Sequence, residues 1–487
     1  SPLQQGLYVE AARHDGTDAS VDVYVTQSVI RLDGDQDADR LRRAAARLLQ
    51  RHRVLRSGFV QPSSGALAVV VPDSVEIPWR TVDLSGEAVA AAGVLLDEIA
   101  VAERVERFDL AAPPLIRFVL ATLPGESGPR AALIVTNHHL LFDGWSGPLV
   151  LADLIEGYVV DDDETRSSAT DYADFLDWLY RQDRAAAVDA WRDELSIVDG
   201  PTLVSTGAAA TVQEMPAEHA VFVGPDTARR LEEFARTSNV TLSTVVQFAW
   251  GVLLSRMTGQ DTVTFGETVS GRPPEIDGVE SMIGLFINTL PVAVSVGSQT
   301  TIADAVRALQ ESKTRLLDHQ HLGLPQIAAA VGEVGFDTLT IFESYPIDGD
   351  AVADGSRAAG LQIAGIDFTD ATHYPLNLFS TPTGDDLGLN LKYLPSAFTA
   401  DEIAGFAAAV VAILGHVVEG PDTVIGDIDL LSAPARAAAL VRAAGDEVAV
   451  RPQTVDALIA AQIAATPDRT ALVVEDRVVD YREFGAR

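Results

Sequence analysis

The chain of 487 residues contains no cysteine. Without thiols it can form no disulfide, no thiol nucleophile and no zinc site built on thiolates. The absence fits a reducing compartment, and we expect the protein in the cytoplasm. The sequence also lacks any apolar run of about 18 residues, so we predict neither a membrane-spanning helix nor a membrane partner.

Basic residues are scarce relative to acidic ones. The chain has 35 Lys and Arg residues and 70 Asp and Glu residues, which gives a formal net charge of -35 at pH 7. A chain of this charge repels phosphate backbones, so we expect no nucleic acid as a partner. The acidic residues are spread along the whole chain, and we interpret most of them as charge that keeps the protein in solution.

The start of the chain, Ser1 to Gln5, has no initiator methionine and none of the basic and apolar regions of a signal peptide. We therefore expect the sequence to be a piece of a longer protein. Apolar residues make up 47% of the chain, which is enough for a large core.

Helix and strand patterns occur in two successive series. In the first, Asp37 can cap a helix whose apolar residues recur on one face from Leu41 to Leu49. Further strands are predicted at 67–71, 115–122 and 131–136, and helices at 146–158, 172–181 and 187–195. The second series predicts strands at 219–223, 262–268, 289–294, 338–343, 360–368, 375–380 and 387–393, and helices at 226–237, 243–258, 302–317 and 400–417. These series indicate two α/β lobes of roughly 200 residues each rather than one large mixed sheet, with a tail after about residue 445.

One segment carries chemistry. Residues Thr136 to His139 end an apolar strand, and Asp143 to Ser146 lead into a helix. Side chains and free backbone amides at such a junction face a cleft. Histidine is the side chain best suited to proton transfer near neutral pH. Asp143 can orient an imidazole or hold the loop through an arginine, and Gly144 lets the backbone approach a ligand.

Two other interpretations of this segment are weaker. Adjacent histidines on a strand point to opposite faces, and no third ligand lies close in sequence, so we predict no metal site. Ser146 lacks the surrounding pattern of a nucleophile elbow.

The segment NHHLLFDGWS resembles the HHxxxDG signature of nonribosomal peptide synthetase condensation domains. Four more motifs of that family match in the same order over about 290 residues. They are the opening motif at Ser1–Leu7, RHxxLR at Arg51–Arg56, YxDFxxW at Tyr172–Trp178, and IGxFxNT at Ile283–Thr289. The resemblance covers roughly residues 1 to 435.

The tail is similar to the opening of an adenylation domain. Residues 462–467, 471–474 and 481–484 carry this likeness. The chain stops before any phosphate-binding loop, so this part alone is not expected to activate an amino acid.

The resemblance implies an α/β fold like that of chloramphenicol acetyltransferase: a V-shaped pseudo-dimer of two α+β two-layer lobes with a tunnel between them. It implies an N-terminal lobe at 1–178 and a C-terminal lobe at 179–435, followed by a linker and truncated adenylation start at 436–487. Residues 266–289 would form the tunnel floor, and roughly 355–383 a latch that reaches across.

The resemblance also implies the reaction. An upstream donor and a downstream acceptor carrier protein would bring substrates on phosphopantetheine arms, and the acceptor amine would attack the donor thioester to form a peptide bond. No cofactor would be bound by this chain itself, and an adenylation domain would continue it. An epimerisation domain, which shares the signature, and an acyltransferase that uses a carrier or coenzyme A remain alternatives.

Site roles follow from the same resemblance. His139 is the expected catalytic residue, as a base or as a group that positions the amine, and the backbone amide of Gly144 is a candidate donor to the oxyanion. His138 and Asp143 are expected to be structural, with Arg272 as the partner of Asp143 and Arg56 as the second choice. The tunnel candidates are Trp145, Ser146, Tyr24, Gln27, Asn288, Glu343, Ser344, His373, Tyr374 and Asn377.

Two details concern the subtype. Many relatives carry an arginine where this chain has Ala293. The segments Pro2–Gly6 and Trp145–Leu149 resemble members that accept a donor ending in a D-configured residue.

Overall fold

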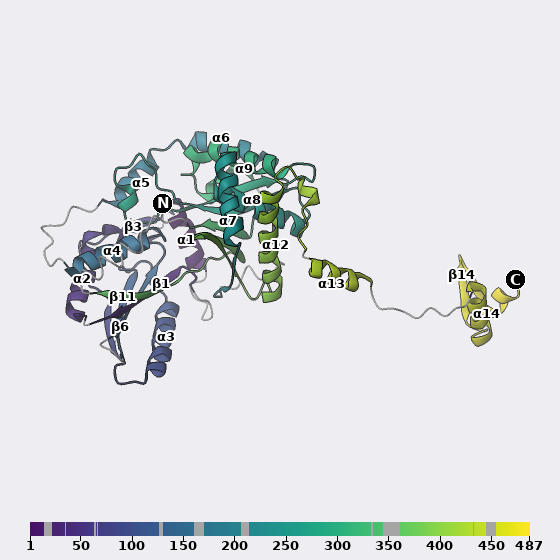
Figure 1. The fold of residues 1–487 in the computed structure, drawn as a ribbon, viewed down its shortest axis with the longest axis horizontal. Helices are drawn as coiled ribbons and strands as arrows, with labels where there is room; N and C mark the ends of the chain where they lie inside the picture. The colour runs from purple at the N-terminus through teal and green to yellow at the C-terminus, as the bar shows by residue number, and fades with distance from the viewer. Residues whose placement is uncertain are drawn as a thin grey trace. The chain divides into compact units, whose positions relative to one another are not determined.

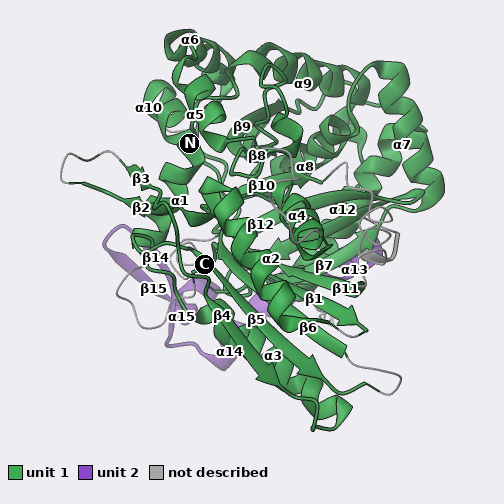
Figure 2. Cartoon of the chain, turned by 90° about the vertical axis from the view of Figure 1, so that its left-hand side faces the viewer, with its two compact units in different colours: residues 1–430 green, residues 431–487 purple. Residues whose placement is uncertain are grey.

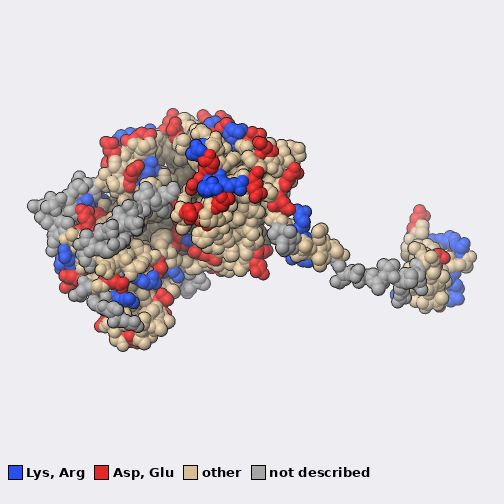
Figure 3. Space-filling view, viewed as in Figure 1, with Lys and Arg blue, Asp and Glu red and all other residues tan. Residues whose placement is uncertain are grey.

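The computed structural model describes residues 1–13, 22–34, 36–62, 65, 67–125, 130–159, 170–205, 214–332, 335–343, 361–431, 433–444 and 454–487. They form two compact units, Ser1–Leu430 and Leu431–Arg487 (Figure 2). On the face drawn in Figure 3, acidic and basic side chains are interleaved over the described surface of the first unit.

The first unit begins with a five-stranded sheet in the order β11-β1-β6-β5-β4. Its strands are β1 (Val25–Asp33), β4 (Trp79–Asp83), β5 (Ile116–Leu123), β6 (Arg130–His138) and β11 (Gln362–Thr369). Side chains alternate along each strand, so each face has its own core. Leu133 and Val135 of β6 pack with helices α2 (Ala38–Arg51) and α4 (Ser146–Val159). Ile134 packs with helix α3 (Val89–Val105) on the other face.

Strand β11 comes from the second half of the chain. It pairs antiparallel with β1, from Gln27 opposite Thr369 to Asp33 opposite Gln362, and it forms an edge of the sheet. Figure 2 shows β11 lying beside β1, on the side away from β6 that the strand order gives it. The segment expected to reach across as a latch therefore adds a strand to the first sheet, while its residues 355–360 lie outside the described residues.

A second sheet of six strands has the order β7-β13-β12-β10-β8-β9. The strands are β7 (Ala217–Phe222), β8 (Thr262–Val269), β9 (Asn288–Ser295), β10 (Thr338–Phe342), β12 (Leu376–Thr383) and β13 (Asp386–Tyr393). One face carries helices α7 (Pro225–Ser238), α8 (Leu242–Thr258), α9 (Ile302–Leu316) and α12 (Ala400–Glu419). Figure 1 shows α7, α8 and α12 side by side there.

Helix α12 is, within the described ranges, the one helix long and apolar enough to cross a membrane, and α7 with α8 would pass only if counted as one bent span. In the fold, α12 is a core helix: Ile403, Val410, Ile413 and Leu414 are buried against the second sheet.

The remaining elements of the first unit are shorter or peripheral. They are α1 (Pro2–Arg13), β2 (Gly58–Val60), β3 (Ala68–Val70), α5 (Tyr172–Tyr180), α6 (Arg184–Glu194) and α10 (Leu324–Val331). The second unit contains α13 (Ala433–Ala444), α14 (Val455–Ala465), the hairpin of β14 (Thr470–Val474) and β15 (Arg477–Asp480), and α15 (Tyr481–Gly485).

The helices and strands expected from the sequence are confirmed, with ends that differ by a few residues. The Asp37 side chain accepts a hydrogen bond from the backbone N–H of Arg40, as its expected cap role requires. Helices α1, α3, α10 and α13 and strands β2 and β4 were not predicted. Helix α3 has no clear polar face, since Val94, Val101 and Val105 are exposed on it, so periodicity could not reveal it.

Candidate active site

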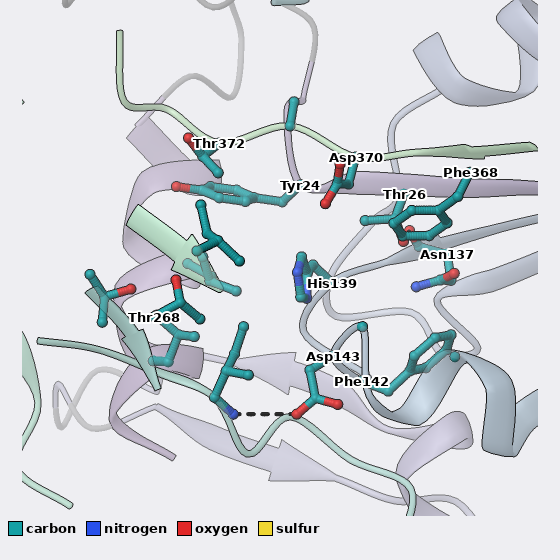
Figure 4. A pocket seen from close by; sticks show the side chains of 18 of the residues that line it. Tyr24, Thr26, Asn137, His139, Phe142, Asp143, Thr268, Phe368, Asp370 and Thr372 are labelled. Carbon is teal, nitrogen blue, oxygen red and sulfur yellow. Dashed lines mark hydrogen bonds between the residues drawn. The ribbon is translucent and has the colours of Figure 1, made fainter. Parts of the chain in front are cut away.

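A cavity of about 820 Å³ lies between the two sheets of the first unit. It is lined from the first sheet by β1, β6 and β11, from the second by β10 and β12, and also by α1 and α4. His139 stands in this cavity, with Tyr24 and Thr268 to one side of it and Asn137 and Phe142 to the other (Figure 4).

His139 faces the cavity because of the parity of β6. Asn137 and His139 share a face with Val135, and all three line the cavity, whereas His138 is fully buried and does not. The backbone N–H of His139 donates to the carbonyl of Tyr24 at 2.8 Å, which fixes the end of the strand. Its Nδ1 is buried and has no hydrogen-bond partner among the described residues, and the residue itself lines the cavity.

His138 is held by the protein. Its Nδ1 accepts the backbone N–H of Leu140 at 3.1 Å, and its Nε2 lies 3.5 Å from a carboxylate oxygen of Asp22. Burial raises the pKa of the Asp22 carboxyl, but the hydrogen bond and the charge of His138 lower it further, so the pKa lies below its usual value. These contacts place His138 in the scaffold of the loop.

Asp143 joins the HHxxxDG loop to the segment at 284–287. One carboxylate oxygen accepts the backbone N–H and the hydroxyl of Ser146, both at 2.9 Å. The other accepts the backbone N–H of Phe286 at 2.9 Å and of Ile287 at 3.3 Å. A buried carboxylate is stable when its lone pairs are satisfied in this way.

Arg272 completes this buried network. Its Nη2 lies 3.4 Å from Asp143 Oδ1 and 2.9 Å from the Ser146 hydroxyl, and its Nη1 donates to the carbonyls of Val279 and Met282. The preceding Gly271 has φ of 60°, and a Cβ there would stand 1.9 Å from the carbonyl oxygen of Phe286. Glycine is therefore required just before the arginine.

The YxDFxxW motif packs on the same segment. The Tyr172 hydroxyl donates to the carbonyl of Leu285, and the rings of Tyr172 and Phe175 contact Phe286. A Cβ at Gly284 would come within 2.1 Å of the Tyr172 ring. Three separate sequence motifs thus meet around residues 284–287, next to the loop that carries His139.

The second choice for the partner of Asp143 is corrected. Arg56 does not reach Asp143, because its guanidinium donates to three backbone carbonyls: those of Leu49 and Gln50 in the last turn of α2, and that of Pro72 after β3. The carbonyls of Leu49 and Gln50 need a donor at the helix C-terminus, which Arg56 supplies.

Tyr24 and His373 lie together on the cavity wall, and the tyrosine hydroxyl is 2.6 Å from His373 Nδ1. Burial raises the pKa of Tyr24 well above its usual value, so the hydroxyl keeps its proton. Tyr374, which stacks on Phe336, lines the cavity beside them.

Glu343 and Asp370 line another part of the cavity. Asp370 and Glu218 lie on either side of Lys392, at 2.5 Å and 3.6 Å from its ammonium. Glu343 accepts a hydrogen bond from Thr381 at 3.1 Å. Burial, and next the carboxylate of Asp370, raise the pKa of Glu343.

Of the other tunnel candidates, Asn288 lines the cavity, but its amide donates to the carbonyls of Gln320 and Leu322. Four candidates do not line it. Gln27 points to the opposite face of β1 and donates to Ala100 and Thr136. Ser146 and Asn377 are buried in local hydrogen bonds, and Trp145 donates to the carbonyl of Glu280. Ser344 lies outside the described residues.

Several residues that line the cavity were missed. Thr26 and Ser28 follow Tyr24 at alternate positions of β1, and Asn137 precedes His139 by two. Strand alternation from the two residues already singled out would have found all three. Asp370, Thr372 and the α1 residues gave no comparable local signal.

Within the described ranges, no group of three or more His, Asp or Glu side chains is arranged to hold a metal ion. Ala293 is buried in a small apolar cluster that includes Trp191 and Leu290. Nothing in the structure explains why many relatives carry arginine there.

A sequence model described as the condensation domain matches residues 1–440. The chain therefore belongs to the condensation-domain family. It is 31% identical over 500 residues to a linear gramicidin synthase protein of Brevibacillus parabrevis, a match that covers 100% of this chain. The chain spans only 6% of that relative's length. Bacitracin synthase 3 of Bacillus licheniformis is 28% identical over 493 residues, and the match covers 100% of this chain and 8% of that protein.

Solved structures share the fold. The first condensation domain of the calcium-dependent antibiotic synthetase matches with a TM-score of 0.67 at 19% identity, covering 88% of this chain and 98% of that one. A four-domain nonribosomal peptide synthetase bound to AMP and glycine matches with a TM-score of 0.71 at 18% identity, covering 100% of this chain and 37% of that one. The predicted α/β fold class with two lobes is confirmed.

Proposed function

We propose that this chain forms a peptide bond between a donor acyl or peptidyl thioester and the amine of an acceptor aminoacyl thioester, each carried on the phosphopantetheine arm of a carrier protein. The observation that carries the proposal is His139, which lines a cavity of about 820 Å³ between the two sheets at the end of strand β6. The family membership of residues 1–440 supports the same chemistry.

In this proposal, His139 meets the attacking amine. It either accepts the proton that the amine releases or holds the amine in line with the thioester carbonyl. Amines are good nucleophiles toward thioesters, so correct placement alone supplies a large part of the rate. The buried network of Asp143, Ser146 and Arg272 holds the loop that carries His139.

Gly144 is proposed to assist through its backbone. It lines the cavity, and its N–H donates to no described group. An amide in that position can donate to the oxyanion that forms when the amine adds to the thioester, a contribution of about 3 kcal/mol in other enzymes.

The test uses donor and acceptor carrier proteins loaded with defined aminoacyl groups, and it detects the amide product by mass. Wild type should form the amide, and His139→Ala should lower the rate by roughly 100-fold or more. The matched control is His219→Ala, a half-buried histidine on β7 that does not line the cavity, and it should keep the wild-type rate.

Two results would overturn the proposal. Equal turnover by wild type and His139→Ala would leave a scaffold that only docks carriers. Inversion at the donor α-carbon without an acceptor, and without amide, would indicate epimerisation instead.

We also propose that residues 436–487 are a linker and the start of an adenylation domain, and that the protein works in the cytoplasm. The alignment of 100% of this chain with part of a four-domain synthetase supports the assignment of residues 436–487, as does the exposed apolar surface of the second unit. Val473, Val474 and Val478 of its hairpin are each at least 60% exposed. Continuing the chain through a whole adenylation domain should slow hydrogen exchange of β14 and β15; unchanged exchange would contradict this assignment.

A further inference from the structure

The cavity has two parts with different chemistry. One part lies between the first sheet and helices α2 and α4, and we name it the apolar wing. Its side chains are Ile30, Leu48, Phe118, Val135, Val150 and Leu154, all buried. The polar part is lined by Glu10, Tyr24, Glu343, Asp370, His373 and Tyr374.

Strand register connects the apolar wing to His139. Ser28 lies opposite both Val135 of β6 and Phe368 of β11, and Ile30 lies opposite Ile366. All five residues line the cavity on the same face as His139. In Figure 4, Thr26, Asn137, Phe142 and Phe368 are grouped on one side of His139. Val135 precedes His139 by four residues, so the wing extends roughly 13 Å from the reaction centre.

Charge decides which substrate enters which part. The acceptor carries an amine, which is an ammonium ion before reaction, and the hydroxyl, imidazole and carboxyl groups of the polar part can hydrogen-bond to it, whereas Asp370 is already paired with Lys392. The named side chains of the apolar wing are all uncharged, and burying a charge among them would be strongly unfavourable. An uncharged aliphatic or aromatic group gains from burial there.

We propose that the apolar wing is a specificity site for the donor: it takes the uncharged side chain or acyl chain attached to the donor thioester. This inference rests on the proposed function. Donors with long apolar groups are thereby preferred, while charged groups of the same length are rejected.

The chain offers a way to fill the wing without a clash. Gly147, in the first turn of α4, lines the cavity, and a Cβ built there meets nothing within 4 Å. Gly147→Phe therefore adds a ring from the helix side, and Ser28→Leu adds bulk from the sheet side. The matched control is Gly93→Phe on α3, where a Cβ also meets nothing within 4 Å and which does not line the cavity.

The first measurement is calorimetric binding of two unreactive thioethers, S-octyl-pantetheine and S-methyl-pantetheine. Wild type and Gly93→Phe should bind the octyl probe at least roughly tenfold more tightly than the methyl probe. Gly147→Phe and Ser28→Leu should lose most of that preference. Equal affinities in wild type, or an unchanged octyl preference in both filled variants, would overturn the proposal.

The second measurement is amide formation with carrier-bound donors of increasing apolar length and one fixed acceptor. Filling the wing should lower kcat/KM for long donors by roughly tenfold and leave acetyl donors unaffected. If the filled variants changed the preference for acceptors and not for donors, the wing would bind the acceptor, and the proposal would be wrong. If wild type forms no amide with any donor, the proposed function fails, while the probe measurement still decides whether the wing binds apolar chains.

Discussion

Arg272 and Asp143 lie 3.4 Å apart and are both buried, although 129 residues separate them in the chain. The aspartate comes from the loop that carries His139, and the arginine follows strand β8 of the second sheet. Their contact therefore holds the reaction centre, on the first sheet, to the second sheet. Ser146 bridges the two charges through its hydroxyl.

Removing the carboxylate of Asp143 should destabilise the fold. Asp143→Ala leaves a buried guanidinium without its counter-charge and two backbone N–H groups without an acceptor, so we expect a loss of about 3–5 kcal/mol in the free energy of unfolding. Chemical denaturation measures it. The control Asp189→Ala, in an exposed pair with Arg192 in the middle of α6, should change stability by less than about 0.5 kcal/mol. An unchanged melting temperature of Asp143→Ala would contradict the structural role.

Gly284→Ala should also be destabilising. The new methyl group would come within 2.1 Å of the Tyr172 ring, which cannot retreat because Phe175 and Phe286 pack against it. We expect a loss of roughly 1–3 kcal/mol or more, read from the denaturant midpoint. Gly405→Ala in α12, where a Cβ meets nothing within 4 Å, should instead be neutral or slightly stabilising. Equal behaviour of the two variants would refute the steric explanation.

Tyr24 and His373 should be energetically coupled. The hydrogen bond between them joins the start of β1 to the loop after β11. A double-mutant cycle of Tyr24→Phe and His373→Ala should give a coupling of about 0.5–1.5 kcal/mol in unfolding free energy. Additive effects of the two substitutions would mean that the contact contributes nothing to stability.

Glu343 should make stability depend on pH. Its raised pKa means that the folded state binds the proton more tightly than the unfolded state does. Its contribution is therefore most favourable below its ordinary value of 4.5 and is lost as the pH rises through the raised value. Glu343→Gln, which keeps an oxygen to accept from Thr381, should melt at a higher temperature than wild type at pH 7. That advantage should shrink at pH 4, and a pH-independent difference would count against the assignment.

The sequence was sufficient where structure is set locally. The helix after Asp37 and the passage from β6 through Asp143 into α4 follow from capping and periodicity, which act over a few residues. The partner of Asp143 followed from the family pattern at Arg272. From the sequence, Arg56 was an equally available cation. In the structure, however, its guanidinium already donates to backbone carbonyls that lie within 16 residues of it in the chain.

The sequence was insufficient where distant segments meet. Tyr24 and Gln27 were both proposed for the cavity, although residues three apart on a strand point to opposite faces, so alternation alone excluded one of them. Alternation could choose between Tyr24 and Gln27 only once it was known which face of β1 lines the cavity. The position of α1 on the cavity wall and the division into an apolar and a polar part depend on packing between lobes, which no local pattern records.

Strand β11 has a consequence for how the protein is made. Gln27 of β1 finds its partner Thr369 only after about 340 further residues have been added. At a synthesis rate of roughly 5–20 residues per second, one edge of the first sheet waits on the order of 20–70 s on the ribosome with its N–H and C=O groups unpaired. If only the first 178 residues were exchanged between relatives, β1 would come from one parent and its pairing strand β11 from the other. A hybrid protein should therefore take residues 1–430 as a whole from a single parent.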